Sequence, residues 1–156
     1  MANSPTQCQI DSPSSANRRV NMKTEKESLS SIMLVEDDDD SRFMLRTLLE
    51  MKGYRVVEAS DGEQALVMME VEKPDLIMMD LQIPRQDGFA VTRRVRQHKS
   101  LHQTPIIICS GHEPVQHKKL AMAAGCNEYL QKPLNFLHLE ETLQRLLPLD
   151  GNSRPH

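Results

Sequence analysis

The sequence is poor in aromatic residues: its 156 residues include no Trp, two Tyr and three Phe. A core built around large rings is therefore excluded, and the apolar side chains available are Leu, Ile, Val, Ala and ten Met. Hydrophobic residues still make up 38% of the chain, enough for the core of one domain. The flexible methionines should make that core adaptable in packing.

Long apolar segments and an excess of positive charge are also missing. No apolar run approaches the roughly 18 residues that a membrane-spanning helix needs, and no secretory signal opens the sequence. We therefore expect a cytoplasmic protein without membrane contacts. The net charge of -3 argues against a nucleic-acid binder, which needs a basic surface to displace counterions.

Cysteine is scarce and histidine shows no pattern. The chain has three cysteines, Cys8, Cys109 and Cys126, which is an odd number. No two of them have the spacing of a metal site or a redox motif. We interpret them as buried, reduced thiols. The six histidines lack metal-site spacing and are expected at the surface, with His112, close to Ser110, as the one exception.

What the chain does contain is a regular alternation of apolar runs and helical periodicities. The apolar runs predict strands at 31–35, 55–59, 75–79, 105–109 and 127–131. Apolar residues at helical spacing predict a first helix that ends before Gly53. The same spacing predicts four further helices, at 62–72, 88–98, 114–124 and 134–147. Unbroken apolar strands favour a parallel sheet covered on both faces, and hence a three-layer α/β sandwich with right-handed crossovers.

This alternation confines the predicted domain to residues 31–147. Residues 1–30 are rich in Ser, Asn, Pro, Thr, Lys and Glu and nearly free of large apolar residues, so we expect a disordered tail. Residues 148–156 form a short polar tail. We expect no second domain and no helix-turn-helix after it, so that any output depends on protein contacts.

Reactive side chains come at the ends of four predicted strands: Glu36 and Asp37, Asp80, Ser110, and Lys132. Parallel strands bring their carboxyl ends to one edge of the sheet, where open α/β sheets bind ligands. Three carboxylates there need a counter-charge, and oxygen ligands select a hard cation such as Mg²⁺. An ammonium and a hydroxyl group can stabilise a phosphoryl group, which a carboxylate can accept as an aspartyl phosphate.

Each of these residues also has an ordinary interpretation. The acidic run 36–40 suits the positive N-terminus of the following helix, which it is expected to cap. Ser110 belongs to a Ser-Gly turn signal, and a lone Lys132 would normally be a surface residue. Asp80 is harder to explain in this way, because it follows four apolar residues and a carboxylate joined to a buried strand needs a partner. The joint placement at strand ends favours a site.

Four stretches together resemble the receiver domain of response regulators from two-component signalling. They are SIMLVEDDDDSRFMLRTLLE, PDLIMMDLQIPRQDGF, TPIIICSGH and AAGCNEYLQKPL, and the resemblance covers about residues 31–147. It implies a flavodoxin-like fold whose five-stranded parallel sheet has the order 2-1-3-4-5. The pattern of apolar runs alone does not give that order.

The resemblance also implies a phosphorylation site with a bound metal ion. Asp80 corresponds to the phosphoacceptor and a metal ligand, Asp37 to a direct Mg²⁺ ligand, and Glu36 to an acid that acts mostly through water. The backbone carbonyl group of Gln82 would complete the metal site, in which Mn²⁺ is an alternative ion. Gln82 and His112 occupy positions that tune the lifetime of the acyl phosphate.

The remaining correspondences concern how phosphorylation is read. Ser110 would hydrogen-bond a phosphoryl oxygen, and Lys132 would form a salt bridge with the phosphoryl group, with a cis bond between Lys132 and Pro133. Tyr129 takes the position of the aromatic switch, which turns inward when Ser110 moves toward the phosphate. Gly111 replaces the more usual Ala and is expected to loosen this loop.

The resemblance implies a stand-alone response regulator, a signalling domain that catalyses only its own phosphorylation and slow dephosphorylation. A sensor histidine kinase or a histidine phosphotransfer protein would phosphorylate Asp80, and an unknown downstream protein or a phosphorylation-dependent dimer would read the change. Two alternatives stay open. A small Mg²⁺-dependent phosphatase of the haloacid dehalogenase type is disfavoured because Gln82 stands where that family has a second Asp. An interaction module that works without phosphorylation is disfavoured by the full set of site residues.

Overall fold

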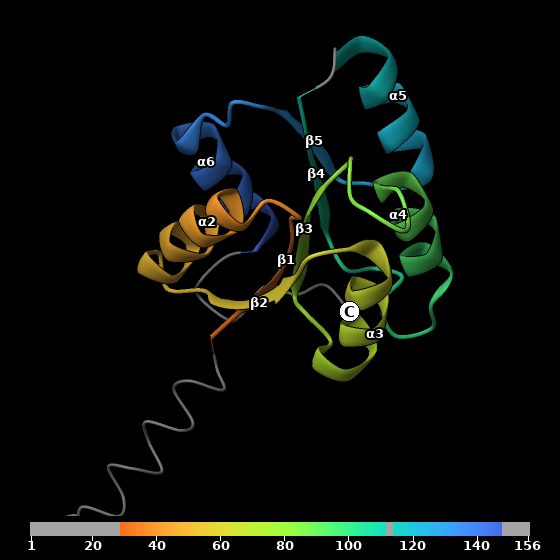
Figure 1. Ribbon diagram of the computed structural model, residues 1–156, viewed down its shortest axis with the longest axis horizontal. Coiled ribbons are helices and arrows are strands. Elements are labelled where there is room, and N and C mark those ends of the chain that lie inside the picture. The colour runs from red at the N-terminus through yellow and green to blue at the C-terminus, as the bar shows by residue number, and fades with distance from the viewer. Residues whose placement is uncertain (1–28, 112–113, 148–156) are drawn as a thin grey trace, which may run out of the picture.

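The computed structural model describes residues 29–111 and 114–147, in which strands and helices alternate (Figure 1). The strands are β1 (Ser31–Val35), β2 (Arg55–Ala59), β3 (Leu76–Asp80), β4 (Ile106–Ser110) and β5 (Glu128–Gln131). The helices are α2 (Asp39–Met51), α3 (Gly62–Glu72), α4 (Gly88–Gln97), α5 (Pro114–Ala124) and α6 (Phe136–Leu146). Every predicted element is present, with small shifts of some ends. The predicted tails 1–30 and 148–156 fall almost entirely outside the described residues, as do Cys8, His112 and His156, and those expectations stay predictions.

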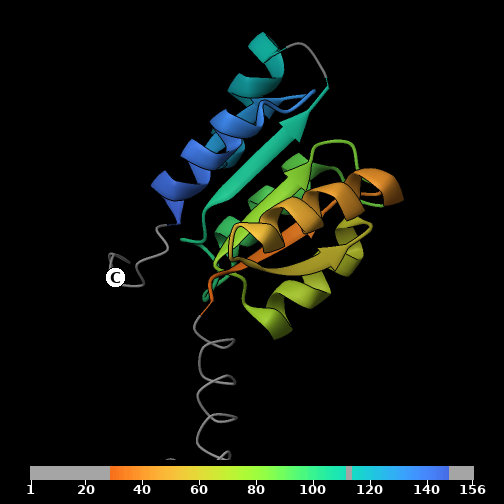
Figure 2. The same ribbon diagram turned by 90° about the vertical axis from the view of Figure 1, so that its left-hand side faces the viewer.

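The five strands form one parallel sheet with the order β2-β1-β3-β4-β5, which confirms the expected flavodoxin-like topology. Helices α2 and α6 cover one face, and α3, α4 and α5 cover the other (Figures 1 and 2). None of the helices in the described part of the chain is long and apolar enough to cross a membrane.

The core is divided into two clusters by the alternation of side chains along the central strands. Ile32 and Leu34 pack in the cluster beneath α2 and α6, whereas Met33 and Val35 pack in the cluster beneath α3, α4 and α5. Successive side chains of a strand point to opposite faces, so a strand covered on both faces must be apolar at every position. This is why the central strands appear in the sequence as unbroken apolar runs.

Acidic or amide side chains begin four of the helices. Asp38, Asp61, Asp87 and Asn135 each accept a hydrogen bond from the backbone N–H group three residues later, at 2.7–3.1 Å. These caps satisfy amide groups that have no partner within the helix. They confirm the predicted capping by the acidic run, and Asp87 marks the start of α4.

Arg96, near the end of α4, connects two loops, the one between α4 and β4 and the one between α5 and β5. Its guanidinium group donates to the carbonyl oxygens of His102, Thr104 and Gly125 at 3.0, 2.7 and 2.8 Å, and to Asn127 Oδ1 at 2.7 Å. Gly125 has φ +114°, and a Cβ atom there would lie 2.8 Å from Arg96 Cγ. Glycine is therefore required by both the backbone conformation and the available space.

Two expectations about side-chain burial need correction. Helical spacing in the sequence places Phe136, Leu139, Leu143 and Leu146 on one face of the last helix. Phe136 is nevertheless 44% exposed, and buried Thr142 joins Leu139 and Leu143 instead. The Thr142 hydroxyl group can be buried because it donates to the His138 carbonyl oxygen over 2.8 Å. His98 and His117 are half-buried rather than on the open surface, and the His117 ring stacks against Phe89 with 6.5 Å between centroids.

Candidate functional site

The carboxyl ends of β1, β3, β4 and β5 bring the predicted site residues to one edge of the sheet. Glu36 follows β1 directly, Asp80 and Ser110 are the last residues of β3 and β4, and Lys132 follows β5. The backbone N–H group of Lys132 donates to the Ser110 carbonyl oxygen over 2.8 Å, which continues the pairing of β4 with β5. The peptide bond between Lys132 and Pro133 is cis, as expected.

The Lys132 ammonium group bridges two carboxylates that are far apart in the sequence. Its Nζ atom lies 2.6 Å from Asp80 Oδ2 and 3.0 Å from Glu36 Oε2. The Glu36 and Asp80 side chains are only 4% and 12% exposed, so water screens these contacts weakly. The counter-charge that clustered carboxylates need is therefore supplied within the chain.

Burial and pairing shift the pKa values of this ion pair. Burial raises the pKa of Glu36 above its ordinary 4.5, against the opposing effects of Lys132 and of the Asp38 N–H group. Burial by itself would lower the pKa of Lys132, but its hydrogen bonds to Asp80 and Glu36 outweigh that effect and raise the pKa to about 12. Lys132 is therefore charged at neutral pH.

Glu36, Asp37 and Asp80 form a group that suits a divalent cation. Each offers one carboxylate oxygen, and these atoms lie within 4.8 Å of one another. The donors are all oxygen, as Mg²⁺ prefers, and Asp37 is exposed, which leaves room for the water ligands that Mg²⁺ retains. The residues therefore fit a magnesium ion.

Two residues expected to read the phosphoryl group, Ser110 and Tyr129, lie on the neighbouring strands β4 and β5. Ser110 is fully buried, and Tyr129 is 5% exposed within the cluster beneath α3, α4 and α5. The Tyr129 hydroxyl group is buried and has no hydrogen-bond partner among the described residues. Gln82 is exposed, and its N–H group donates to Asp80 Oδ1 over 2.9 Å. Their roles in signalling stay predictions.

The two described cysteines contribute no reactive group. Cys109 lies beside Asp80 in the sheet register, and both Cys109 and Cys126 are buried and free. Burial raises the pKa of Cys109 to about 12 and that of Cys126 to about 11, so both remain protonated thiols at neutral pH. The interpretation of these two residues as buried, reduced thiols is confirmed.

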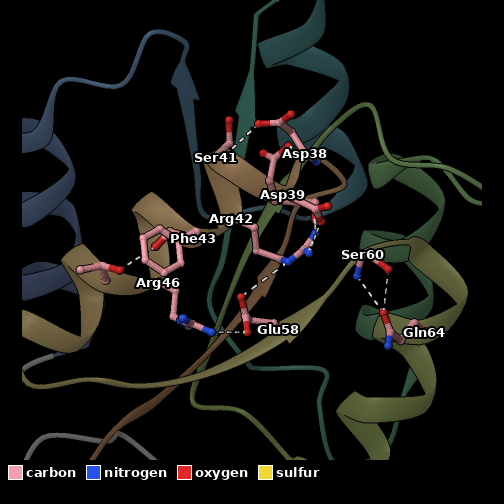
Figure 3. A network of polar contacts seen from close by, with 11 residues as sticks. Asp38, Asp39, Ser41, Arg42, Phe43, Arg46, Glu58, Ser60 and Gln64 are labelled. Atoms are coloured by element: carbon pink, nitrogen blue, oxygen red, sulfur yellow. Dashed lines mark hydrogen bonds and ion pairs between the residues drawn. The ribbon is translucent and has the colours of Figure 1, made fainter.

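One contact next to the site was not predicted from the sequence. Arg42, on α2, donates from Nη1 to the backbone carbonyl oxygen of Glu36 over 2.8 Å. Figure 3 shows Arg42 among Asp39, Glu58 and Arg46, in a network that joins α2 to β2. An arginine in the first turn of a helix that follows an acidic run was the available signal, but its carbonyl partner is visible only in three dimensions.

Comparisons with known proteins agree with this geometry. Residues 32–144 match the family model of the response regulator receiver domain. The transcriptional regulatory protein CpxR of Escherichia coli K12 is 34% identical over 119 residues, which are 76% of this chain and 50% of CpxR. The alkaline phosphatase synthesis transcriptional regulatory protein PhoP of Bacillus subtilis is 38% identical over 104 residues, which are 67% of this chain and 42% of PhoP. The chain thus spans about half the length of the curated relatives it matches.

Solved structures lead to the same family. Chemotaxis protein CheY4 of Vibrio cholerae has a TM-score of 0.72 at 31% identity, over 76% of this chain and 99% of CheY4. The receiver domain of the sensor histidine kinase PA1611 from Pseudomonas aeruginosa, which has a magnesium ion coordinated in its active site cleft, has a TM-score of 0.70 at 33% identity, over 76% of this chain and 97% of that domain. Fold, site geometry and sequence agree, and this chain belongs to the response regulator receiver domain family.

Proposed function

We propose that Asp80 accepts a phosphoryl group from the phosphohistidine of a sensor histidine kinase or a histidine phosphotransfer protein. The observation that carries this proposal is the Lys132 ammonium group, 2.6 Å from Asp80 and 3.0 Å from Glu36, at the edge where the three carboxylates meet. A carboxylate held between a fixed cation and a cation-binding acidic group can act as a nucleophile toward a charged phosphoryl group.

In the transfer step, an Asp80 carboxylate oxygen attacks phosphorus as the bond from phosphorus to the donor imidazole nitrogen breaks. The electron pair of that bond returns to the imidazole, and Asp80 becomes an acyl phosphate. Asp37, Asp80, the Gln82 carbonyl group and, through water, Glu36 would hold Mg²⁺ or Mn²⁺, which supplies charge stabilisation for the phosphoryl oxygens. Lys132 stays protonated and can move its hydrogen bonds from the carboxylates to the phosphoryl oxygens.

Signalling would follow as a shift between two conformations of the same domain. Ser110 would hydrogen-bond a phosphoryl oxygen, and Tyr129 would turn further inward. The surface formed by α5, β5 and α6 would then exchange partners, either a downstream protein or a second copy of the chain. Support comes from the burial of Ser110 and from the unpaired Tyr129 hydroxyl group, which loses no described hydrogen bond when the ring moves. In this proposal the chain acts in the cytoplasm as a signalling domain rather than as a metabolic enzyme.

Labelling with acetyl phosphate and MgCl₂, followed on a Phos-tag gel, tests the phosphoacceptor. The wild type should give a shifted band that EDTA abolishes, and Asp80→Asn should give none. Asp40→Asn, which removes an exposed carboxylate from the same acidic run, is the matched control and should label normally. Equal labelling of Asp80→Asn and the wild type would refute the assignment.

A further inference from the structure

The loop that carries the acidic pair is held by an arginine that does not belong to the cation-binding group. The Glu36 carbonyl oxygen, which accepts from Arg42 Nη1 over 2.8 Å, belongs to the peptide unit that joins Glu36 to Asp37. Because a peptide unit is planar, fixing this oxygen also fixes the plane that contains the Asp37 amide nitrogen. Arg42 thereby limits the directions in which the Asp37 side chain can point.

Asp37 depends on this support more than its neighbours do. The Glu36 side chain is anchored by Lys132 at 3.0 Å and by the N–H group of Asp38 at 3.2 Å. Asp37 is exposed, and its side chain has no hydrogen-bond or ion-pair partner within the described part of the chain. The backbone on either side of Asp37 therefore determines where its carboxylate lies.

Arg42 is itself oriented by a carboxylate on the neighbouring strand. Arg42 Nε lies 3.6 Å from Glu58 Oε1, and the other oxygen of Glu58 accepts from Arg46 Nη1 over 3.0 Å (Figure 3). The Arg42 side chain is only 19% exposed, whereas that of Asp39, which also pairs with Arg42, is 88% exposed and contributes little. A planar guanidinium group can hold a carbonyl oxygen and a carboxylate at the same time, which an ammonium group cannot do with the same geometry.

We infer that Arg42 is a positioning residue for the divalent cation, because it holds the peptide unit between Glu36 and Asp37 in place. Glu58 acts on the cation site only by orienting Arg42. The inference rests on the proposed function, because it takes Glu36, Asp37 and Asp80 as the cation-binding group. Partners that orient metal ligands from outside the first coordination shell typically contribute about 10- to 100-fold to metal affinity.

The sign of the effect separates positioning from plain electrostatics. Arg42 carries a positive charge near the acidic group, so charge alone predicts that its removal would strengthen the binding of Mg²⁺. Positioning predicts the opposite, because an unrestrained Asp37 must be ordered when the ion binds. Arg42→Lys keeps the charge and loses the fork-shaped geometry, so it should weaken binding if geometry matters and leave binding unchanged if only charge matters.

The experiment is a titration of the full chain with MgCl₂ at constant ionic strength, followed by amide chemical shifts in two-dimensional NMR. Arg42→Ala should weaken Mg²⁺ affinity by about 10-fold, and Arg42→Lys should weaken it by a smaller factor. Arg55→Ala is the matched control: it removes an arginine of β2 that pairs with Glu72 over 3.4 Å, and it should leave the affinity unchanged. The thermal midpoint of each variant in EDTA measures its stability independently of Mg²⁺ binding. If Arg42→Ala does not fold, the Mg²⁺ affinity of Arg42→Lys alone tests the inference.

A double-mutant cycle tests the part played by Glu58. Glu58→Gln should weaken Mg²⁺ affinity in the wild-type background and have no effect in the Arg42→Ala background. Equal effects in both backgrounds would refute the action of Glu58 through Arg42. Unchanged or tighter binding by both Arg42 variants would overturn the inference and leave the cation site intact, whereas a wild type that binds no Mg²⁺ would overturn the proposed function itself.

Discussion

Replacing Lys132 by Met removes the charge that bridges the site while keeping an unbranched side chain of similar length. The carboxylates raise the pKa of Lys132 from 10.5 to about 12, and a rise of about 1.5 corresponds to about 2 kcal/mol. This is an upper limit, because the Lys132 side chain is 29% exposed and the carboxylates can take up protons. A raised lysine pKa gives stability that is fully present below pH 10.5 and is lost as the pH rises through about 12, so the whole effect acts at pH 7.

Two opposite changes are expected in the Lys132→Met variant. Without Mg²⁺, the free energy of unfolding should fall by about 1–2 kcal/mol, which lowers the thermal midpoint by roughly 4–8 °C in a domain of this size. Affinity for Mg²⁺ should rise, because the competing cation is gone, and the same upper limit of about 2 kcal/mol allows a gain of roughly 30-fold. Bound Mg²⁺ should then restore more stability to the variant than it adds to the wild type.

Thermal denaturation followed by circular dichroism, at pH 7 in EDTA and in MgCl₂, measures both changes. Lys52→Met is the matched control, because Lys52 is also 29% exposed and lies 3.0 Å from a carboxylate, that of Glu140, in the pair that joins α2 to α6. This control should lose little stability and should respond to Mg²⁺ like the wild type. If Lys132→Met has the same thermal midpoint as the wild type in EDTA and gains no extra stability from MgCl₂, the Lys132 charge does not have the role assigned to it.

Three further predictions concern a strained glycine, a buried tyrosine hydroxyl group and the two buried cysteines. Gly125→Ala should destabilise the fold by about 1–3 kcal/mol in urea unfolding, because Gly125 has φ +114°. Gly111→Ala should be nearly neutral, since among the described residues beyond its chain neighbours no heavy atom lies within 4 Å of the added Cβ. Equal losses in the two variants would contradict this. Tyr129→Phe removes a buried hydroxyl group without a described partner, so its thermal midpoint should equal or exceed that of the wild type, and a clear fall would reveal a missing hydrogen bond. In a Cys8→Ser variant, Cys109 and Cys126 should react with a disulfide reagent at pH 8 slowly in the folded protein and rapidly in urea. The reason is that burial raises their pKa values to about 12 and about 11. Rapid reaction of the folded protein would contradict their burial.

The elements of this fold could be predicted because each leaves a local pattern in the sequence. A strand buried on both faces must be apolar throughout, and a covering helix must repeat its apolar residues every three or four positions. The placement of Asp80 and Lys132 followed from the same rule, because a polar residue directly after a buried strand has to lie at the edge of the sheet. The strand order could not be predicted in this way and came from the family resemblance, since each apolar run would fit several neighbours equally well.

By itself, the sequence determined which side chains reach the edge of the sheet, because chain direction and strand burial are local properties. Tertiary structure alone decided which of them touch. Lys132 meets Asp80 and Glu36 across 52 and 96 residues of sequence, and this pairing shifts the pKa values within the site. Arg42 meets Glu58 only because α2 packs against β2. Contacts between distant segments depend on the register and the packing of whole elements, and no local pattern records them.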